Sequence, residues 1–297
     1  VVQFVVPMAI TVGVFGWLGG DPQTATVRGV TSTLWLQNAG FVFVPFIAVS
    51  AFAAWFGMND IATMRASFAD QAVIFRRTHN WIMCWLYTGT FGSFIGFSAA
   101  FPLLSKILFP EVNALQYAFL GPLVGALSRV AAGKACDRIG GGRITFWAFI
   151  AMAAGVLAVL YAIGQKDFSI FFASFLFLFF TAGVGNASTF QMIPAIMRKE
   201  IARLEPAMGP AERVKQSDKE AAAIIGFTSA IAAYGAFFIP KSFGTSIAAT
   251  GGAEWALYGF LGFYVTCVLA TWWFYTRRGG LLYDIERGGA ARPVAAQ

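Results

Sequence analysis

Arg129 has the most distinctive chemical environment in this sequence. It is the only charged residue in an apolar stretch of residues 114–132. A cation within a membrane helix costs a few kcal/mol or more unless it faces a protein interior, an anion or water. The stretch therefore predicts a functional residue within the membrane. The alternative is that Arg129 extends to the membrane surface, since residues 133–143 are expected to form a loop about one helical turn away.

Aromatic and amide side chains are further candidates for such a site. Tyr87 and Phe91 are four residues apart, so they share one face of a helix expected over residues 81–104. A tyrosine hydroxyl can donate to an anion while a phenylalanine ring excludes water; a packing stripe is the alternative. Asn186 shares a helical face with Gly183 and Phe190. It is expected either to line a pore or to hydrogen-bond between helices.

Small residues dominate residues 221–236, where ten of sixteen are Gly, Ala or Ser. Gly226 and Ala230 form one pair four residues apart, a spacing that lets another helix approach closely. Close approach of a substrate is the alternative interpretation of this pair.

A glycine-rich segment, residues 133–143, reads GKACDRIGGGR. Its glycines permit a tight reversal, and its carboxylate can pair with a nearby cation or a helix end. The pattern resembles the loop motif of major facilitator transporters, which implies state-dependent closure without direct substrate contact. The candidate residues of this conformational motif are Gly133, Asp137, Arg138, Gly140, Gly141 and Arg143.

Metal and redox chemistry are poorly supported. Cys84, Cys136 and Cys267 are dispersed, and no two have metal-ligand or redox spacing. His79 is the one histidine, in a basic stretch that is expected to be a solvated loop. These residues are too few to ligate haem or an iron–sulfur cluster. The sequence predicts no metal or cofactor and argues against a membrane oxidoreductase or any other enzyme.

Composition identifies the broad class. The chain is 58% hydrophobic and 12% charged, with a mean hydropathy of +0.68, whereas soluble domains are about 25% charged. The apolar runs are long and do not alternate, which predicts an all-α polytopic membrane protein. The expected spans are residues 1–18, 34–56, 81–104, 114–132, 144–163, 168–197, 221–239 and 255–275. The first is short and lacks the features of a signal peptide, so it is interpreted as the tail of a longer helix.

Charge asymmetry between the connections predicts the orientation. Sixteen lysine and arginine residues fall in one set, which comprises residues 59–80, 133–143, 198–220 and the C-terminal tail, against four in the alternate set. The rich side is expected to be cytoplasmic. The net charge of +7 is thereby explained by topology and does not indicate nucleic-acid binding.

Five segments closely resemble the nitrate/nitrite porters of the major facilitator superfamily, the NarK type. They are WLYTGTFGSFIGFSAAFPLLSK, QYAFLGPLVGALSR, GKACDRIGGGR, GNASTFQMIP and GFTSAIAAYGAFFIPKSFG. The resemblance runs nearly end to end; Ala187, where some relatives have Gly, is a mild departure. It implies a major facilitator fold covered from the end of helix 5 through helix 12. Residues 1–58 would then close the N-terminal bundle, 59–79 link the bundles in the cytoplasm, 80–278 form the C-terminal six-helix bundle and 279–297 a cytoplasmic tail.

The resemblance also implies a binding site. These porters bind nitrate between two arginines, one in each bundle, and Arg129 matches the C-terminal one. Tyr87 and Phe91 match the helix 7 residues that line the site. Residues 226–235, with Gly226 and Ala230, match the second nitrate signature, while the partner arginine is expected upstream.

The resulting expectation is transport of nitrate and nitrite by alternating access in a bacterial cytoplasmic membrane, with the C-terminus in the cytoplasm. No Asp or Glu falls within an expected span, which favours nitrate/nitrite antiport over nitrate–proton symport, the alternative. A passive anion channel is a further alternative. The expected partners are nitrate, nitrite, membrane lipid and the missing N-terminal bundle.

Overall fold

A computed structural model describes residues 23–27, 30–34, 44–58, 71–112 and 117–283 of the chain. The chain divides into two compact units, Val1–Arg65 and Ala66–Gln297, each of which is described by itself. The span expected over residues 1–18 and the tail of residues 284–297 lie outside the described residues.

The first unit contains a hairpin and one helix. Strand β1 (Gln23–Val27) pairs antiparallel with β2 (Val30–Leu34), with Val27 opposite Val30. This hairpin was not predicted from the sequence, although both strands are rich in β-branched threonine and valine, which favour extended backbone. Helix α2 (Val44–Gly57) has 14 residues and is about 21 Å long. The expected span over residues 34–56 is therefore shorter within the described chain, because Leu34 belongs to β2.

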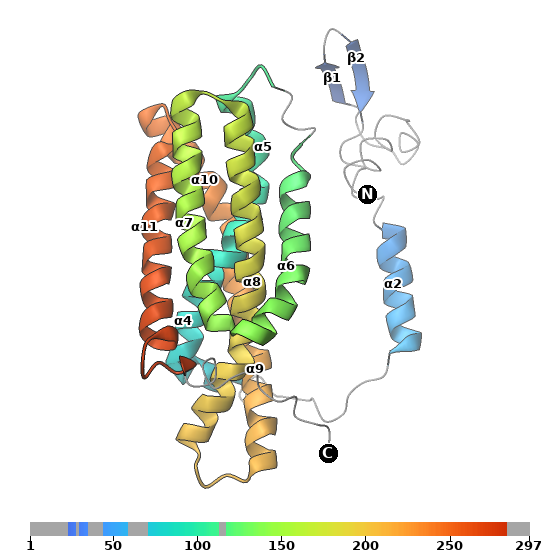
Figure 1. Cartoon of the computed structure of the whole chain (residues 1–297). Coiled ribbons are helices and arrows are strands. Elements are labelled where there is room, and N and C mark those ends of the chain that lie inside the picture. Colours follow the sequence, from blue (N-terminus) through green and yellow to red (C-terminus); the bar gives the residue numbers. More distant parts are fainter. Residues whose placement is uncertain (1–22, 28–29, 35–43, 59–70, 113–116, 284–297) are drawn as a thin grey trace. The chain divides into compact units, whose positions relative to one another are not determined.

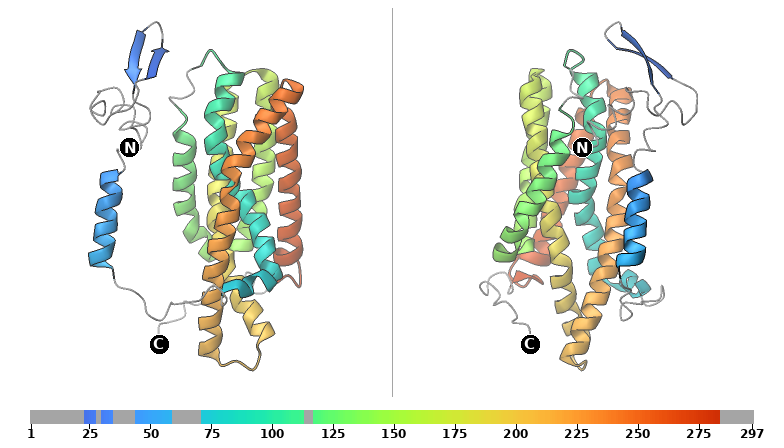
Figure 2. Two further views of the ribbon diagram at one scale, coloured as in Figure 1. Left: turned by 180° about the vertical axis from the view of Figure 1, so that it is seen from behind. Right: turned by 90° about the vertical axis from the view of Figure 1, so that its right-hand side faces the viewer.

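The second unit is a bundle of helices (Figure 1). Its elements are η4 (Ala72–Arg76), α4 (Thr78–Tyr87), η5 (Thr88–Gly92), α5 (Ser93–Leu108), α6 (Leu120–Ile139), α7 (Gly141–Gln165), α8 (Phe168–Leu204), α9 (Pro210–Ala233), α10 (Gly235–Thr250), α11 (Glu254–Thr271) and η7 (Trp272–Thr276). Helix α8 packs against both α6 and α7, and α10 packs against α5 (Figure 2). Phenylalanine rings fill the space between α5 and α8, as in the pair Phe101 and Phe175, whose ring centroids are 5.3 Å apart.

Five helical segments of the described chain are long and apolar enough to cross a membrane. They are Thr78–Leu108, Gly141–Gln165, Phe168–Leu204, Pro210–Thr250 and Glu254–Thr276. Helix α6 is not among them, because charged residues occupy its last third. Its 20 residues still give a length of about 30 Å, the thickness of the hydrocarbon core. The chain is thus a multi-pass helical membrane protein.

Two glycines allow the first and fourth of these segments to cross at close range. Segment η5 is a π-helical turn between α4 and α5. A side chain at Gly235, where α10 begins, would overlap the Gly92 backbone in η5. A side chain at Gly92 would in turn lie 3.0 Å from the Ala232 carbonyl oxygen. The π-helical turn, a feature frequent at functional sites, therefore packs directly against the α9–α10 junction.

Helices continue through most of three segments that were expected to be connections. Residues 133–139 belong to α6, and only Gly140 separates α6 from α7. Gly140 has φ 103°, which a residue with a side chain rarely adopts. Most of residues 198–220 belongs to α8 and α9, whose ends project beyond the rest of the bundle (Figure 1). Lys241, one of the four cations counted in the alternate set of connections, lies within α10.

Candidate functional site

Helix α6 places Arg129 against α8 through a close helix contact one turn away. A side chain at Gly183 of α8 would overlap the Gly125 carbonyl and the Ser128 hydroxyl of α6. The Ser128 hydroxyl donates across this contact to the Phe180 carbonyl at 3.0 Å. The two backbones are therefore held together immediately before Arg129, as small residues allow in membrane helices.

The Arg129 guanidinium lies over the Phe190 ring, with its central carbon 5.8 Å from the ring centroid. This contact directs the side chain along α8, and Arg129 itself is exposed in this chain. Helix α6 continues for ten residues beyond Arg129, about 15 Å. Lys134 lies about 7.5 Å from Arg129 along the helix axis. The connection after α6 is therefore further from Arg129 than the sequence suggested.

Tyr87, Asn186 and Phe91 form a hydrogen-bonded and stacked group beside this arginine. The Tyr87 hydroxyl donates to Asn186 Oδ1 at 3.2 Å, and the ring stacks on Phe91 with centroids 5.2 Å apart. The Tyr87 hydroxyl also interacts with Ser229 of α9 and lies within electrostatic range of Arg129. Four sequence-predicted residues thus come together from α4, η5, α6 and α8. Asn186 therefore forms the hydrogen bond between helices that was one of its two expected roles. Its other expected role, lining a pore, stays a prediction.

Neutral hydroxyl pairs continue from this group along α8. Thr90 and Thr189 share a hydrogen bond at 3.0 Å, and Thr145 and Ser188 share one at 2.7 Å. These pairs join α8 to η5 and to α7. Buried polar groups that are satisfied in this way fix the register of the helices around the site.

Gly226 and Ala230 lie on an exposed face of α9. Gly226 borders a separate groove of about 220 Å³ that also includes Gln71, Ala72 and Phe75. No atom lies within 4 Å of a Cβ built at Gly226, so the described chain leaves this face open. The pair is therefore not packed against a helix of the described chain.

The conformational motif lies at the α6–α7 junction. Asp137 accepts a hydrogen bond from the Gln191 side-chain amide of α8. A Cβ at Gly141 would lie 2.9 Å from the Ser188 carbonyl oxygen, so α7 also begins tightly against α8. Gly133, Arg138 and Arg143 lie on either side of this junction. The motif thus connects α6 and α7 to α8 at Gln191 and Ser188, within one helical turn of Phe190.

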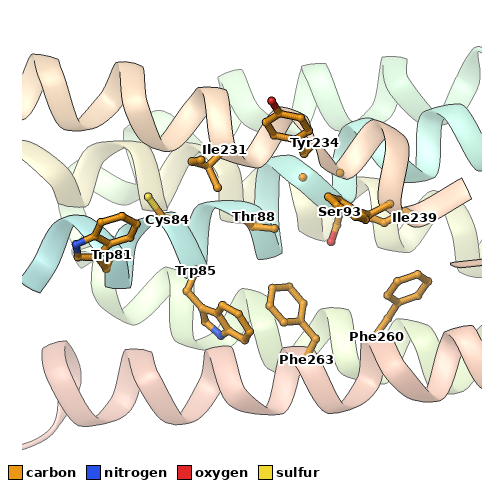
Figure 3. Close-up of a pocket in the computed structure, with 13 residues that line it drawn as sticks. Trp81, Cys84, Trp85, Thr88, Ser93, Ile231, Tyr234, Ile239, Phe260 and Phe263 are labelled. Carbon is orange, nitrogen blue, oxygen red and sulfur yellow. The ribbon is translucent and has the colours of Figure 1, made fainter. Parts of the chain in front are cut away.

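An apolar pocket whose lining does not include Arg129 lies elsewhere in the second unit (Figure 3). It has a volume of about 500 Å³ between α4, α9–α10 and α11. Trp81, Trp85 and Phe263 are among the labelled side chains around it. Its lining contains no charged residue, so it offers no cation for an inorganic anion.

A buried ionic cluster beside the start of α4 was missed by the sequence analysis. Arg77 donates to both carboxylate oxygens of Glu220 at 2.8 Å, and the Glu220 side chain is 1% exposed. The prediction that His79 is solvated is wrong: its side chain is 14% exposed and bonds the Tyr275 hydroxyl at 3.1 Å. The partners lie more than 120 positions away in sequence, so local charge patterns could not reveal them. The helix-forming character of residues 198–204 and 210–220 was the available signal.

Metal binding has no support within the described residues, where no group of three His, Cys, Asp or Glu side chains is placed to hold an ion. The three cysteines are buried in different helices, α4, α6 and α11, as free thiols.

The structure shows a polytopic helical membrane protein in which an arginine, a tyrosine and an asparagine from three helices lie near one another. The chain is similar along most of its length to proteins named NarU and NarK2, and its all-helical second unit agrees with the major facilitator fold expected from the sequence. It is 47% identical over 285 residues to "Nitrate/nitrite transporter NarU" of Escherichia coli (strain K12). It is 40% identical over 287 residues to "Probable nitrate/nitrite antiporter NarK2" of Thermus thermophilus.

These alignments include 94% of this chain in both cases, but 61% of NarU and 60% of NarK2. The chain thus spans about three fifths of the length of these curated relatives. No family model matches it.

Proposed function

We propose that this chain is part of a transporter that exchanges nitrate and nitrite across a bacterial cytoplasmic membrane by alternating access. The observation that carries the proposal is the 47% identity to a nitrate/nitrite transporter across 94% of this chain. The printed name of NarK2, a probable nitrate/nitrite antiporter, supports exchange in particular.

Arg129 is the proposed anion-binding residue. Nitrate is planar and monovalent, and a guanidinium presents planar, fork-like donors with a charge that persists at any working pH. Phe190 beneath the guanidinium restricts its orientation. Tyr87, fixed by Asn186 and stacked on Phe91, adds a hydroxyl and an apolar wall beside it. We assign Gly226 and Ala230 to the same translocation path, on the face of α9 that the described chain leaves open.

The α6–α7 junction is the proposed conformational element. Alternating access requires helices to change their packing on one side of the membrane. Asp137 and Gln191 join the end of α6 to α8, and Gly140 permits a reversal that other residues resist. Together with Gly133, Arg138, Gly141 and Arg143, these residues would close and open the cytoplasmic side.

The proposed organisation follows from the same homology. Residues 1–58 would complete a first bundle, residues 59–79 would link it to the second in the cytoplasm, and residues 80–278 would form the second bundle. The tail, residues 279–297, would be cytoplasmic. The charge asymmetry of the connections supports this orientation.

Nitrate–proton symport is the second candidate, and two buried carboxylates bear on it. Glu200 and Glu220 both lie where α8 and α9 project from the bundle, remote from the middle of the spans. Residues 81–104, 144–163, 168–197, 221–239 and 255–275 contain no Asp or Glu. This arrangement favours exchange, because a proton carried through the membrane normally uses an embedded carboxylate or histidine.

Exchange in proteoliposomes tests the proposal. Vesicles that contain the transporter are loaded with nitrite and diluted into nitrate, with the pH gradient intact or collapsed by an ionophore. We expect nitrate uptake that requires internal nitrite and persists without the gradient. Strict dependence on inward proton movement would instead establish symport, and uptake that needs neither proton nor counter-anion would establish a channel.

A further inference from the structure

The ionic cluster beside the start of α4 contains one tight contact and one loose contact. Arg77 and Glu220 form a bidentate pair at 2.8 Å, and Gln216 donates to the same carboxylate at 2.8 Å. His79 Nε2 lies 3.7 Å from Glu200 Oε2, longer than the 2.7–2.9 Å or so of a charge-assisted hydrogen bond. The first contact fixes α4 to α9, while the second holds α4 to α8 only weakly.

Among the described residues, the groups shown to contact His79 or to act on it electrostatically come from two elements. Helix α8 contributes Glu200 and the cation Arg203, and η7 contributes the Tyr275 hydroxyl at 3.1 Å from Nδ1. Tyr275 is fully buried. The imidazole thus joins the start of α4 to the end of α8 and to the end of the α11 segment.

This closed arrangement leaves polar atoms unsatisfied. Glu200 Oε2 and both polar side-chain atoms of Asn80 are buried without a hydrogen-bond partner among the described residues. Unsatisfied buried groups lose hydration without compensation, so the arrangement is poised to open. A proton on His79 would add a cation that is largely removed from water, beside a carboxylate too distant to bond it and beside Arg203.

We propose that His79, Glu200 and Tyr275 form a proton-sensitive latch, in which protonation of His79 releases the end of α8 from α4 and η7. An acidic cytoplasm would then favour an arrangement in which water reaches His79 and the last two turns of α8 separate from the bundle. The Arg77–Glu220 pair would hold α9 in place throughout, because its guanidinium stays charged over the same pH range. The latch lies apart from Arg129, so it would regulate transport without touching the anion.

Hydrogen exchange on the transporter in lipid nanodiscs tests the latch without any substrate. Protection of the amides of residues 196–204 is measured between about pH 7.5 and pH 5.5, the range in which histidine titrates, and is corrected for the intrinsic pH dependence of exchange. We expect these amides to lose protection on acidification, while those of residues 152–160 in the core of α7 do not.

His79→Gln is the decisive variant, because its neutral amide does not titrate. It should remove the pH dependence of protection at residues 196–204, and His79→Asn serves the same purpose if His79→Gln does not fold. Unchanged protection of the wild-type protein across this range would overturn the proposal. An equal loss in the glutamine or asparagine variant would also overturn it, since another group, such as Glu200, would then be responsible. Neither readout depends on transport, so failure of the latch is distinct from failure of the proposed exchange.

Discussion

Arg129 and Arg77 show how the surroundings of one residue type determine its role. Arg77 is committed to a carboxylate that is 1% exposed, and its hydrogen bonds to Glu220 raise the pKa of the guanidinium above its ordinary value. Arg129 has an aromatic neighbour, Phe190, and remains exposed in this chain. The first arginine is positioned to stabilise the fold, and the second is available to bind an anion.

Arg129→Lys should nearly abolish nitrate transport although it keeps a positive charge. Lysine lacks the planar fork, and losing a charge-assisted contact of this kind costs roughly 1.5–3 kcal/mol, or about 10- to 150-fold in affinity. Nitrate affinity and exchange rate in proteoliposomes measure the effect. Arg198→Lys, at a side chain that is 61% exposed, is the matched control and should transport normally. Near-normal transport by Arg129→Lys would favour an arginine that merely extends to the membrane surface.

Arg77→Met should destabilise the protein by about 3–5 kcal/mol, because it leaves the buried Glu220 carboxylate unpaired. Thermal unfolding in detergent, at a fixed detergent concentration, measures the change. The double variant Arg77→Met with Glu220→Met should regain most of the loss, since apolar replacements remove the unpaired charge. If the double variant is as unstable as the single one, the cost lies in packing and not in the ion pair.

At the scale of elements, glycine contacts set the distances between helices. Gly183 brings α8 onto α6 next to Arg129, and Gly235 brings α10 onto η5 next to Tyr87. The site therefore lies between two close helix crossings. Bulk added at either crossing would separate the elements that carry its residues.

Gly235→Ala should lower the thermal stability of the protein by about 1–3 kcal/mol through overpacking. The added methyl would overlap the Gly92 backbone, which cannot move aside as a flexible side chain can. Gly244→Ala on the same helix is the control, because no atom lies within 4 Å of the position that its added methyl would occupy. Equal melting temperatures for the two variants would show that the α10–η5 crossing tolerates a wider spacing.

At the scale of the whole molecule, charge determines orientation. The α8–α9 projection, residues 198–220, contains six of the 19 lysine and arginine residues of the second unit, and it projects from one end of the bundle (Figure 1). Residue 218 in this projection has a side chain that is 52% exposed. It is therefore a suitable position from which to read the side of the membrane.

An Asp218→Cys variant should react with a membrane-impermeant thiol reagent only from the cytoplasmic side. Reaction from intact cells, compared with inverted membrane vesicles, measures this, and the three native cysteines are buried and should react slowly. Lys166→Cys lies just after α7, at the end of that helix away from the α6–α7 junction. This variant should react from outside the cell. Labelling of residue 218 from outside intact cells would reverse the proposed topology.

The sequence by itself determined the class of this protein and most of its candidate site. Long apolar runs require helices in a membrane, and an isolated arginine in such a run requires a special environment. Arg129 could be selected on these grounds, and Tyr87, Phe91 and Asn186 could be selected from their spacing along expected helices; the structure brings the four together.

Only the tertiary structure decided where the helices end and which charges are buried. Charged residues such as those of 133–139 and 198–204 do not break a helix. The end of an apolar run in the sequence therefore does not mark the end of the helix. The partners of Arg77 and His79 are supplied by α8, α9 and η7, more than 120 residues away. A local sequence pattern carries no information about such contacts, because they exist only after the helices have packed.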